Sequence, residues 1–307
     1  MHEVEVFRTN ELIDPHMHIW GWEVPVYLFL GGLAAGVMVL GSLLLVRHDR
    51  KELSQWLRLL PFVAPIAISL GMGALFLDLE YKWHVYRFYL AFRPLSPMSW
   101  GAWILVGIYP ATVLLGFAAL RRSHVEILGK QSLVARLHSL VGAHFKTLAW
   151  ANVVLGVGLG AYTGLLLGTL SARPMWNSAV LAPLFLVSGL SSGAALMMLF
   201  PISEKEHHQL RRWDIAAISL ELSLLALFLL GLATGGGEAG QQAIGLLVGG
   251  SYTAAFWALV VFAGLGVPLV LELVESRRHL RPTVMTPILI LVGGIALRWI
   301  LVSAGQA

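Results

Sequence analysis

The stretch that decides the fold is residues 16–36, which read HMHIWGWEVPVYLFLGGLAAG. Two histidines, two tryptophans and a glutamate stand directly before an apolar run. Within that run the small residues form a row, namely Gly31, Gly32, Ala34, Ala35 and Gly36. Polar and aromatic residues of this kind collect at a membrane surface, and small residues let membrane helices approach closely. The stretch therefore predicts an interfacial segment that leads into a tightly packed transmembrane helix.

The composition of the whole chain agrees with a membrane protein. Hydrophobic residues make up 57% of the sequence and charged residues only 12%, whereas a soluble domain carries about 25% charged residues. The net charge is +4, but the basic residues fall in short loops between apolar runs, which argues against nucleic-acid binding. The absence of cysteine excludes disulfides and cysteine-ligated iron–sulfur clusters within this chain. The acidic first 14 residues lack the pattern of a cleavable signal peptide.

Eight apolar segments are long enough to cross about 30 Å of hydrocarbon as helices. We therefore expect an all-α integral membrane protein with one membrane domain over residues 1–307. Its parts are an outer N-terminal segment (1–23), a first half with three helices and a connecting loop (24–145), and helices four to eight (146–307). The predicted spans are 24–46, 59–77, 100–120, 147–169, 177–200, 213–233, 251–273 and 283–303.

The loop charges predict the orientation. Fifteen lysines and arginines lie in the loops 47–58, 121–146, 201–212 and 274–282, and only five lie on the other side. Because basic loops stay inside, both termini should lie on the outer, periplasmic side. The glycine-rich loop 234–250, also outside, is interpreted as a flexible connection or a packing surface.

A weak internal repeat suggests two four-helix halves. LFLGGLAAG at 28–36 is similar to LFLVSGLSSG at 184–193, and a tryptophan and a proline precede each. Similar apolar words also arise by chance in membrane proteins, so both explanations stay open.

The histidines argue against haem and draw attention to the N-terminal segment. None of the eleven lies deep inside a predicted span, so we expect no haem in this chain. His16 and His18 are either interfacial residues of an aromatic belt or ligands of a quinone headgroup, to which a histidine can donate a hydrogen bond and relay a proton. Asp14 is placed to orient the His18 ring, and Glu23 to pass a proton on to water.

Four further charged residues are candidates. Asp78 closes the second span, and we expect it to be partly buried and to exchange protons at the outer surface. Glu221, near the middle of the sixth span, is either a protonated structural glutamate or a station on a proton path, with Asn152 and Ser223 as possible partners. Arg298 is expected to snorkel to the interface. Arg173, in a short outer loop, is placed to pair with an acidic group or a headgroup.

Five sequence segments, taken in their order along the chain, resemble the polysulfide reductase membrane subunit (NrfD/PsrC-like) family over nearly the whole chain. They are WGWEVPVYLFLGGLAAG, RPLSPMSWGAWIL, YTGLLLGTLSARPMWNS, LVSGLSSGAA and GGIALRWILVSAGQ.

The resemblance implies an eight-helix, haem-free subunit that binds menaquinone or ubiquinone near the outer surface of a bacterial or archaeal inner membrane. It also implies two partners, an iron–sulfur subunit and a catalytic subunit, most often of the molybdopterin type. Carried over by position, the quinone site includes His18 or His16 and Tyr162, beside Trp22. Asp14 stands where the family pattern has an asparagine.

The function expected from the sequence is therefore a membrane subunit that binds quinone or quinol and exchanges electrons with a docked iron–sulfur subunit, with possible proton translocation. Two rival hypotheses remain. One is a structural membrane anchor without a competent quinone site, and the other is a proton or solute transporter. For the transporter, helices broken at mid-membrane would be the sign, and Pro65 and Pro268 are the candidate positions.

Overall fold

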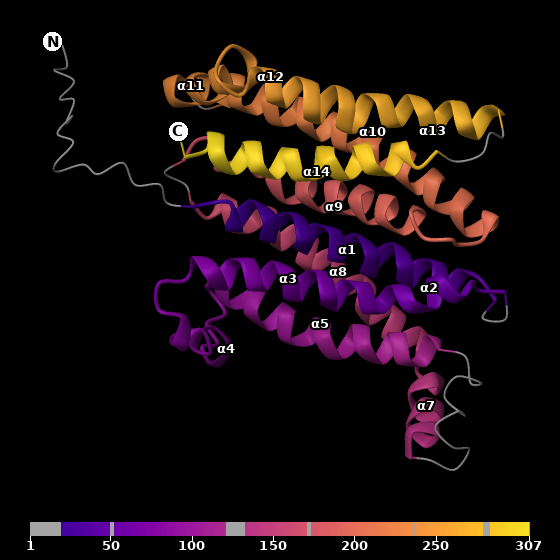
Figure 1. The fold of residues 1–307 in the computed structure, drawn as a ribbon. Helices are drawn as coiled ribbons and strands as arrows, with labels where there is room; N and C mark the ends of the chain where they lie inside the picture. Colours follow the sequence, from indigo (N-terminus) through magenta and orange to yellow (C-terminus); the bar gives the residue numbers. More distant parts are fainter. Residues whose placement is uncertain are drawn as a thin grey trace, which may run out of the picture.

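The computed structural model describes residues 20–49, 52–120, 133–170, 173–235, 237–278 and 283–306 (Figure 1). Over these residues the secondary structure is helical, and eight helices are long and apolar enough to cross a membrane. The prediction of eight spans is thus confirmed for this part of the chain. The spans are α1 (Glu23–Arg47), α2, η1 and α3 together (Gln55–Leu59, Leu60–Phe62 and Val63–Asp78), α5 (Pro97–Ala119), α8 (Phe145–Gly168), α9 (Leu181–Met198), α10 (Glu204–Gly235), α12, η3 and α13 together (Thr253–Ala255, Phe256–Gly266 and Val267–Arg278), and α14 (Met285–Ala304).

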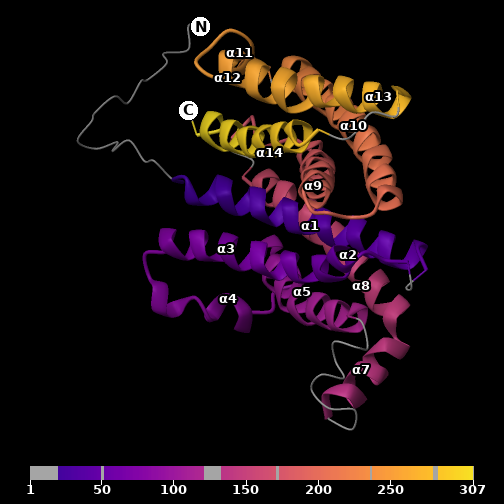
Figure 2. The same cartoon turned by 45° about the vertical axis from the view of Figure 1, so that its right-hand side comes forward.

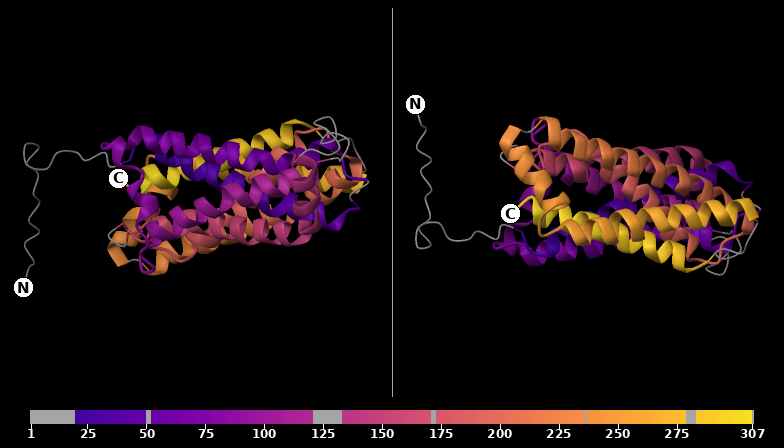
Figure 3. Two further views of the ribbon diagram at one scale, coloured as in Figure 1. Left: turned by 90° about the horizontal axis from the view of Figure 1, so that it is seen from below. Right: turned by 90° about the horizontal axis from the view of Figure 1, so that it is seen from above.

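The spans run side by side, so the bundle has two distinct ends (Figures 1 and 3). One end, called the α4 end, carries α4 (Arg87–Leu90) and α11 (Gly237–Val248) together with Gln306. The opposite end, called the α7 end, carries α2 and α7 (Leu133–Ala143). Figure 2 shows α7 projecting away from the bundle, roughly across the direction of the spans.

Helix α1 lies at the centre of the bundle and packs against α3, α8, α9 and α14. Its closest approach is to α9, where the small-residue row of α1 meets a second row. Gly36 lies directly against the backbone of Gly189, and a Cβ atom added to Gly193 would come 2.6 Å from the Cα of Gly36. No side chain larger than hydrogen fits between the two backbones at these positions, as expected for membrane helices that associate through small residues. The two similar segments, 28–36 and 184–193, therefore pack against each other.

The structure adds detail to one loop and to one span. Residues 237–248, inside the loop interpreted as a flexible connection, form α11, because Ala243 and Leu247 fall on one face and are both buried. The seventh span is not broken at Pro268 but runs continuously from Thr253 to Arg278. The chain absorbs this proline by a π-helical stretch, η3, that ends just before it.

The beginning and the end of the described chain are tied together at the α4 end. The Trp20 N–H donates to Gln306 Oε1 over 2.8 Å, and Gln306 Nε2 donates to the Trp20 carbonyl over 3.2 Å. The Trp20 ring stacks on Trp176 with 5.0 Å between ring centroids, and Trp176 Nε1 donates to the Leu301 carbonyl. Trp20, just before α1, is therefore anchored on the end of α14 and on the loop before α9.

Candidate functional site

Two buried tyrosines lie at the α4 end of the bundle. Tyr27 lies one turn into α1, and Tyr162 lies in the last two turns of α8; both are buried. The Tyr162 ring covers Gly101 in α5, where any side chain would collide with it. Tyr27 is close enough to Tyr162 for their phenols to interact. A phenol can donate a hydrogen bond to a carbonyl oxygen and return the proton later, which is the chemistry that a quinone headgroup requires.

Glu23 adds a carboxylate to this end of α1. It is the first residue of the helix, one turn before Tyr27, and it is half-buried. Its Oε2 atom is buried and finds no hydrogen-bond donor among the described residues. A buried carboxylate oxygen without a donor is unusual, since such groups are normally satisfied. Glu23 is therefore available to a ligand or a proton at this end.

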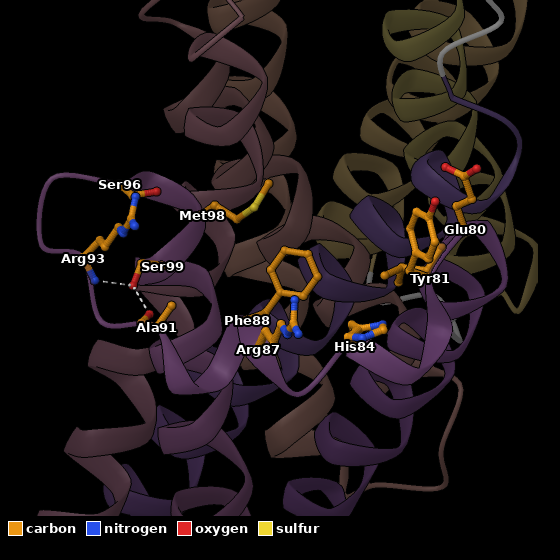
Figure 4. Close-up of a pocket in the computed structure, with 11 residues that line it drawn as sticks. Glu80, Tyr81, His84, Arg87, Phe88, Ala91, Arg93, Ser96, Met98 and Ser99 are labelled. Carbon is orange, nitrogen blue, oxygen red and sulfur yellow. Dashed lines mark hydrogen bonds between the residues drawn. The ribbon is translucent and has the colours of Figure 1, made fainter.

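A cavity of about 480 Å³ opens at the same end of the bundle, between the end of α3, α4 and the start of α5, and its lining does not include the two tyrosines or Glu23 (Figure 4). In Figure 4, Arg93, Ser96 and Ser99 lie on one side, Glu80 and Tyr81 on the other, and Phe88 and Met98 between them. Ser99 Oγ holds this loop by accepting from the Arg93 N–H over 3.0 Å and donating to the Ala91 carbonyl over 2.9 Å. An apolar interior with a few polar groups at its rim is typical of a small-molecule site.

Tyr89, in α4, lies next to this cavity and outside the membrane spans. Partial burial, and secondarily the neighbouring Tyr109, raises the pKa of its phenol above the usual value. Tyr89 therefore stays a neutral hydrogen-bond donor over the physiological range.

The structure separates the other residues that the sequence predicted. Asp14, His16 and His18 lie outside the described residues. Trp22 lies at the α4 end with 48% of its surface exposed. Asp78 ends α3 and is exposed, so the expectation of partial burial was wrong; as the last residue of its helix it projects beyond its neighbours. Arg173 donates from Nη1 to the Gln306 carbonyl over 3.2 Å, where an acidic partner or a headgroup was expected.

Arg298 corrects a second expectation, because it does not snorkel to the interface. Its side chain is completely buried and donates to the carbonyl oxygens of Leu28, Phe185 and Gly294 and to Ser188 Oγ. The physical reason is its helix face, which it shares with Gly294 and which points into the bundle, away from lipid. Small residues make room for it, since a Cβ atom on Gly32 would come 2.6 Å from Arg298 Nη2.

Glu221 is buried in the middle of α10, as predicted, but its partners differ from those expected. Asn152 Nδ2 donates to the carbonyls of Ala111 and Leu148, and Ser223 Oγ donates to the Ser219 carbonyl. The Glu221 carboxyl instead lies within hydrogen-bonding reach of Ser188 and close to Arg298. Ser188 thus lies between an acid from α10 and a guanidinium from α14.

A second group of buried charges lies nearer the α7 end, between α10 and α13. Asp214 accepts a hydrogen bond from Ser191 Oγ over 2.6 Å and neighbours Glu272. Beyond them, Arg211 Nη2 pairs with Glu275 Oε2 over 3.3 Å, and both side chains are buried. Charges at such positions are costly unless they are paired or protonated, so they are candidates for function.

Several of these residues were not predicted from the sequence. Glu272 lies inside the predicted span 251–273 and could have been found by the criterion that selected Glu221, an acid within an apolar run. Asp214 lies at the second position of the predicted span 213–233, where an acid is ordinary. Tyr27 and Ser188 carry no signal of their own, because tyrosine and serine are common in membrane helices.

Comparison with known proteins gives consistent likenesses over nearly the whole chain. The family model described as "Polysulphide reductase, NrfD" matches residues 10–307. A chain of the polysulfide reductase of Wolinella succinogenes is 29% identical over 301 residues, which are 94% of each of the two proteins. Protein NrfD of Escherichia coli is 32% identical over 303 residues, 94% of this chain and 95% of that one. A subunit of the tetrathionate reductase of Salmonella typhimurium is 28% identical over 289 residues, 91% of this chain and 76% of that one.

Proposed function

Because the chain belongs to the polysulphide reductase NrfD family, we propose that it is the quinone-reactive membrane subunit of a respiratory oxidoreductase complex. Its relatives are named as single chains or subunits of polysulfide, selenate and tetrathionate reductases, so a multi-subunit reductase with catalytic and electron-transfer partners is the context that they imply. The membrane part of the assignment stands on the eight apolar helices. The substrate of the complex belongs to another polypeptide.

The observation that carries quinone binding is the group of residues at the α4 end. Tyr27 and Tyr162 supply two buried phenols, Glu23 supplies a carboxylate oxygen without a donor among the described residues, and a largely apolar cavity of about 480 Å³ lies at the same end of the bundle. A quinone needs an apolar surface for its ring and tail, donors for two carbonyls, and a group that accepts protons. By the family resemblance, His18 or His16 completes the site, and we add Asp14, which is placed to orient the His18 ring, and Trp22.

Electrons leave through a partner. The chain contains no cysteine and therefore cannot ligate an iron–sulfur cluster by thiolates. Oxidation of quinol to quinone releases two electrons and two protons, so an iron–sulfur subunit docked at the α4 end takes the electrons. That subunit connects in turn to a catalytic subunit, of the molybdopterin type or related.

The α4 end faces the outside in this proposal, and the membrane is the bacterial or archaeal inner membrane. The described basic residues of the basic loops, such as Arg47, Arg58 and Arg136, support this orientation, since the helices that carry them lie or end at the α7 end. Protons from quinol then leave to the outer water by way of Glu23 and Asp78, with Arg173 nearby. Proton translocation across the bundle is the further part of the proposal, and it assigns Glu221 as a station because that acid is buried at mid-span.

The test begins with extraction in mild detergent and identification of the copurifying proteins by mass spectrometry. We expect an iron–sulfur subunit with cysteine motifs. The His18→Ala variant of the same complex should assemble but lose quinone-linked turnover, and normal turnover would refute the assignment of His18.

The two rival functions give different results. A structural anchor would copurify with the same partners but fail to bind a quinone analogue. A transporter would purify without redox partners. The seventh span does not favour the transporter, because it runs on through Pro268, one of the two candidate positions for a break.

A further inference from the structure

Two buried acids on neighbouring helices lie side by side, and neither forms an ion pair with a described residue. Asp214 on α10 and Glu272 on α13 are 0% and 1% exposed, and their carboxyl groups are within hydrogen-bonding reach of each other. Asp214 Oδ1 is satisfied by the Ser191 hydroxyl. Asp214 Oδ2 and Glu272 Oε2, however, are buried and find no donor among the described residues.

One proton resolves this arrangement. Two ionised carboxylates only accept hydrogen bonds, so neither can satisfy the other, and two adjacent negative charges in a bilayer repel strongly. If one acid is protonated, its O–H donates to the other, and the pair carries a single shared charge. We propose that Asp214 and Glu272 form a proton-binding carboxyl pair that loads and unloads from the α7 end.

The charged groups around the pair support this assignment. Arg211, on α10 one turn before Asp214, is near Glu272, but its guanidinium is engaged by Glu275 over 3.3 Å. His207 lies one turn further toward the α7 end, close to both Arg211 and Glu275. On the other side, Glu221 lies close enough to Asp214 to add to the negative potential at the pair when it is ionised. From α9, Ser191 supplies a hydroxyl and no charge.

The Arg211–Glu275 ion pair separates the carboxyl pair from the water at the α7 end. Glu275 follows Glu272 by three residues, about 4.5 Å along the helix, and Arg211 precedes Asp214 by the same step. Glu275 Oε1 also accepts from the backbone N–H and the hydroxyl of Thr283, over 3.1 Å and 2.8 Å, in the connection to α14. A proton from the water at this end thus has to pass the Arg211–Glu275 ion pair before it reaches the carboxyl pair.

In the opposite direction the pair adjoins Glu221 and, beyond it, Ser188 and Arg298. The direction in which protons move along this series rests on the proposed quinone function. The presence of an exchangeable proton on the pair does not rest on the quinone function, since it follows from the two carboxyl groups alone.

The rival explanation is that the acids only hold α9, α10 and α13 together. The two explanations differ in whether a carboxyl is protonated near neutral pH and can exchange its proton. Dicyclohexylcarbodiimide distinguishes them, because this hydrophobic reagent reacts with protonated carboxyls inside membrane proteins. Infrared difference spectra in H₂O and D₂O report the same group through its carbonyl stretch.

The experiment uses the whole purified complex over a pH series. We expect the reagent to modify Asp214 or Glu272, as located by peptide mass spectrometry, and modification to fall as the pH rises. We also expect one carbonyl band that shifts in D₂O and disappears in Glu272→Gln. The control is Glu52→Gln, an exposed acid paired with Lys205, which should leave both signals unchanged.

No reaction at either acid and no shifting band at any pH at which the complex stays assembled would overturn the proposal. Carbodiimide labelling and the D₂O shift are both measured on the unaltered protein. The proposal can therefore be refuted even if the Glu272→Gln variant fails to fold. Failure of the quinone assignment is recognised separately. A complex with the shifting band but without quinone-analogue binding keeps the proton site and loses the proposed function.

Discussion

Arg298 on α14 donates from Nη1 to Ser188 Oγ on α9 over 3.0 Å, deep inside the bundle. The same serine lies within hydrogen-bonding reach of Glu221 on α10. Side chains from α9, α10 and α14 therefore meet at one hydroxyl group. The guanidinium also lies over the rings of Phe29 and Phe185, at 5.8 Å and 5.3 Å from their centroids, so it is enclosed on all sides by protein.

Replacing Arg298 should be strongly destabilising. Arg298→Leu removes four hydrogen bonds and leaves Glu221 buried without its neighbouring cation, which typically costs about 3–5 kcal/mol. We expect a clear fall in the thermal unfolding midpoint of the purified complex, measured by tryptophan fluorescence. The matched control is Arg212→Leu, because Arg212 is exposed on α10. Equal midpoints for the two variants would show that the buried network contributes nothing.

The glycine contact between α1 and α9 should not tolerate even a methyl group. Gly36→Ala places a Cβ atom against the Gly189 backbone, so the helices must separate, at a cost of about 1–3 kcal/mol. Gly73→Ala on α3 is the control, since a Cβ atom there meets nothing within 4 Å and alanine favours a helix by about 0.5–1 kcal/mol. We expect Gly36→Ala to lower the midpoint and Gly73→Ala to leave it unchanged or raise it. The opposite order would refute the close approach.

The absence of cysteine allows a direct test of orientation. Lys82→Cys, at the α4 end, and Lys205→Cys, at the α7 end, each introduce a single thiol at an exposed position. In intact spheroplasts we expect an impermeant maleimide to label only the first variant, and in inverted vesicles only the second. The reverse result would place the proposed quinone site on the inner side.

Tyr162→Phe tests the α4-end site without disturbing its shape. The change removes one hydroxyl, and a lost hydrogen bond of about 1 kcal/mol lowers affinity for a quinone analogue about fivefold. Tyr109→Phe serves as the control, because the Tyr109 hydroxyl contacts Ser69 Oγ over 3.0 Å at an exposed position. We expect weaker binding only in Tyr162→Phe, measured by titration of the assembled complex. Unchanged binding would remove Tyr162 from the site.

The spans were predictable from the sequence, whereas the side-chain partners were not. An apolar run of about twenty residues has essentially one solution in a bilayer, so the eight helices followed from composition alone. The direction of the Arg298 side chain was not predictable in this way. Its distance from the helix end suggested snorkelling, but its helix face, which depends on how α1, α9 and α14 pack, turns it inward.

For Glu221, the depth in the membrane was predictable but the contacting residues were not. Its depth was predicted correctly because depth follows from position within a span. Its contact with Ser188 joins residues on two different helices, and no local pattern identifies such a pair. The expected partners Asn152 and Ser223 satisfy their own helices or an adjacent carbonyl instead. The N-terminal candidates Asp14, His16 and His18 stay predictions.

The two hydrogen bonds between Trp20 and Gln306 have a consequence for biosynthesis. Trp20 precedes α1 and Gln306 follows α14, so the bonded residues lie 286 positions apart in the sequence. Trp20 can therefore reach its final position only after α14 has been inserted beside α1. A partner that recognises this closed end of the bundle would then bind only once α14 is in place.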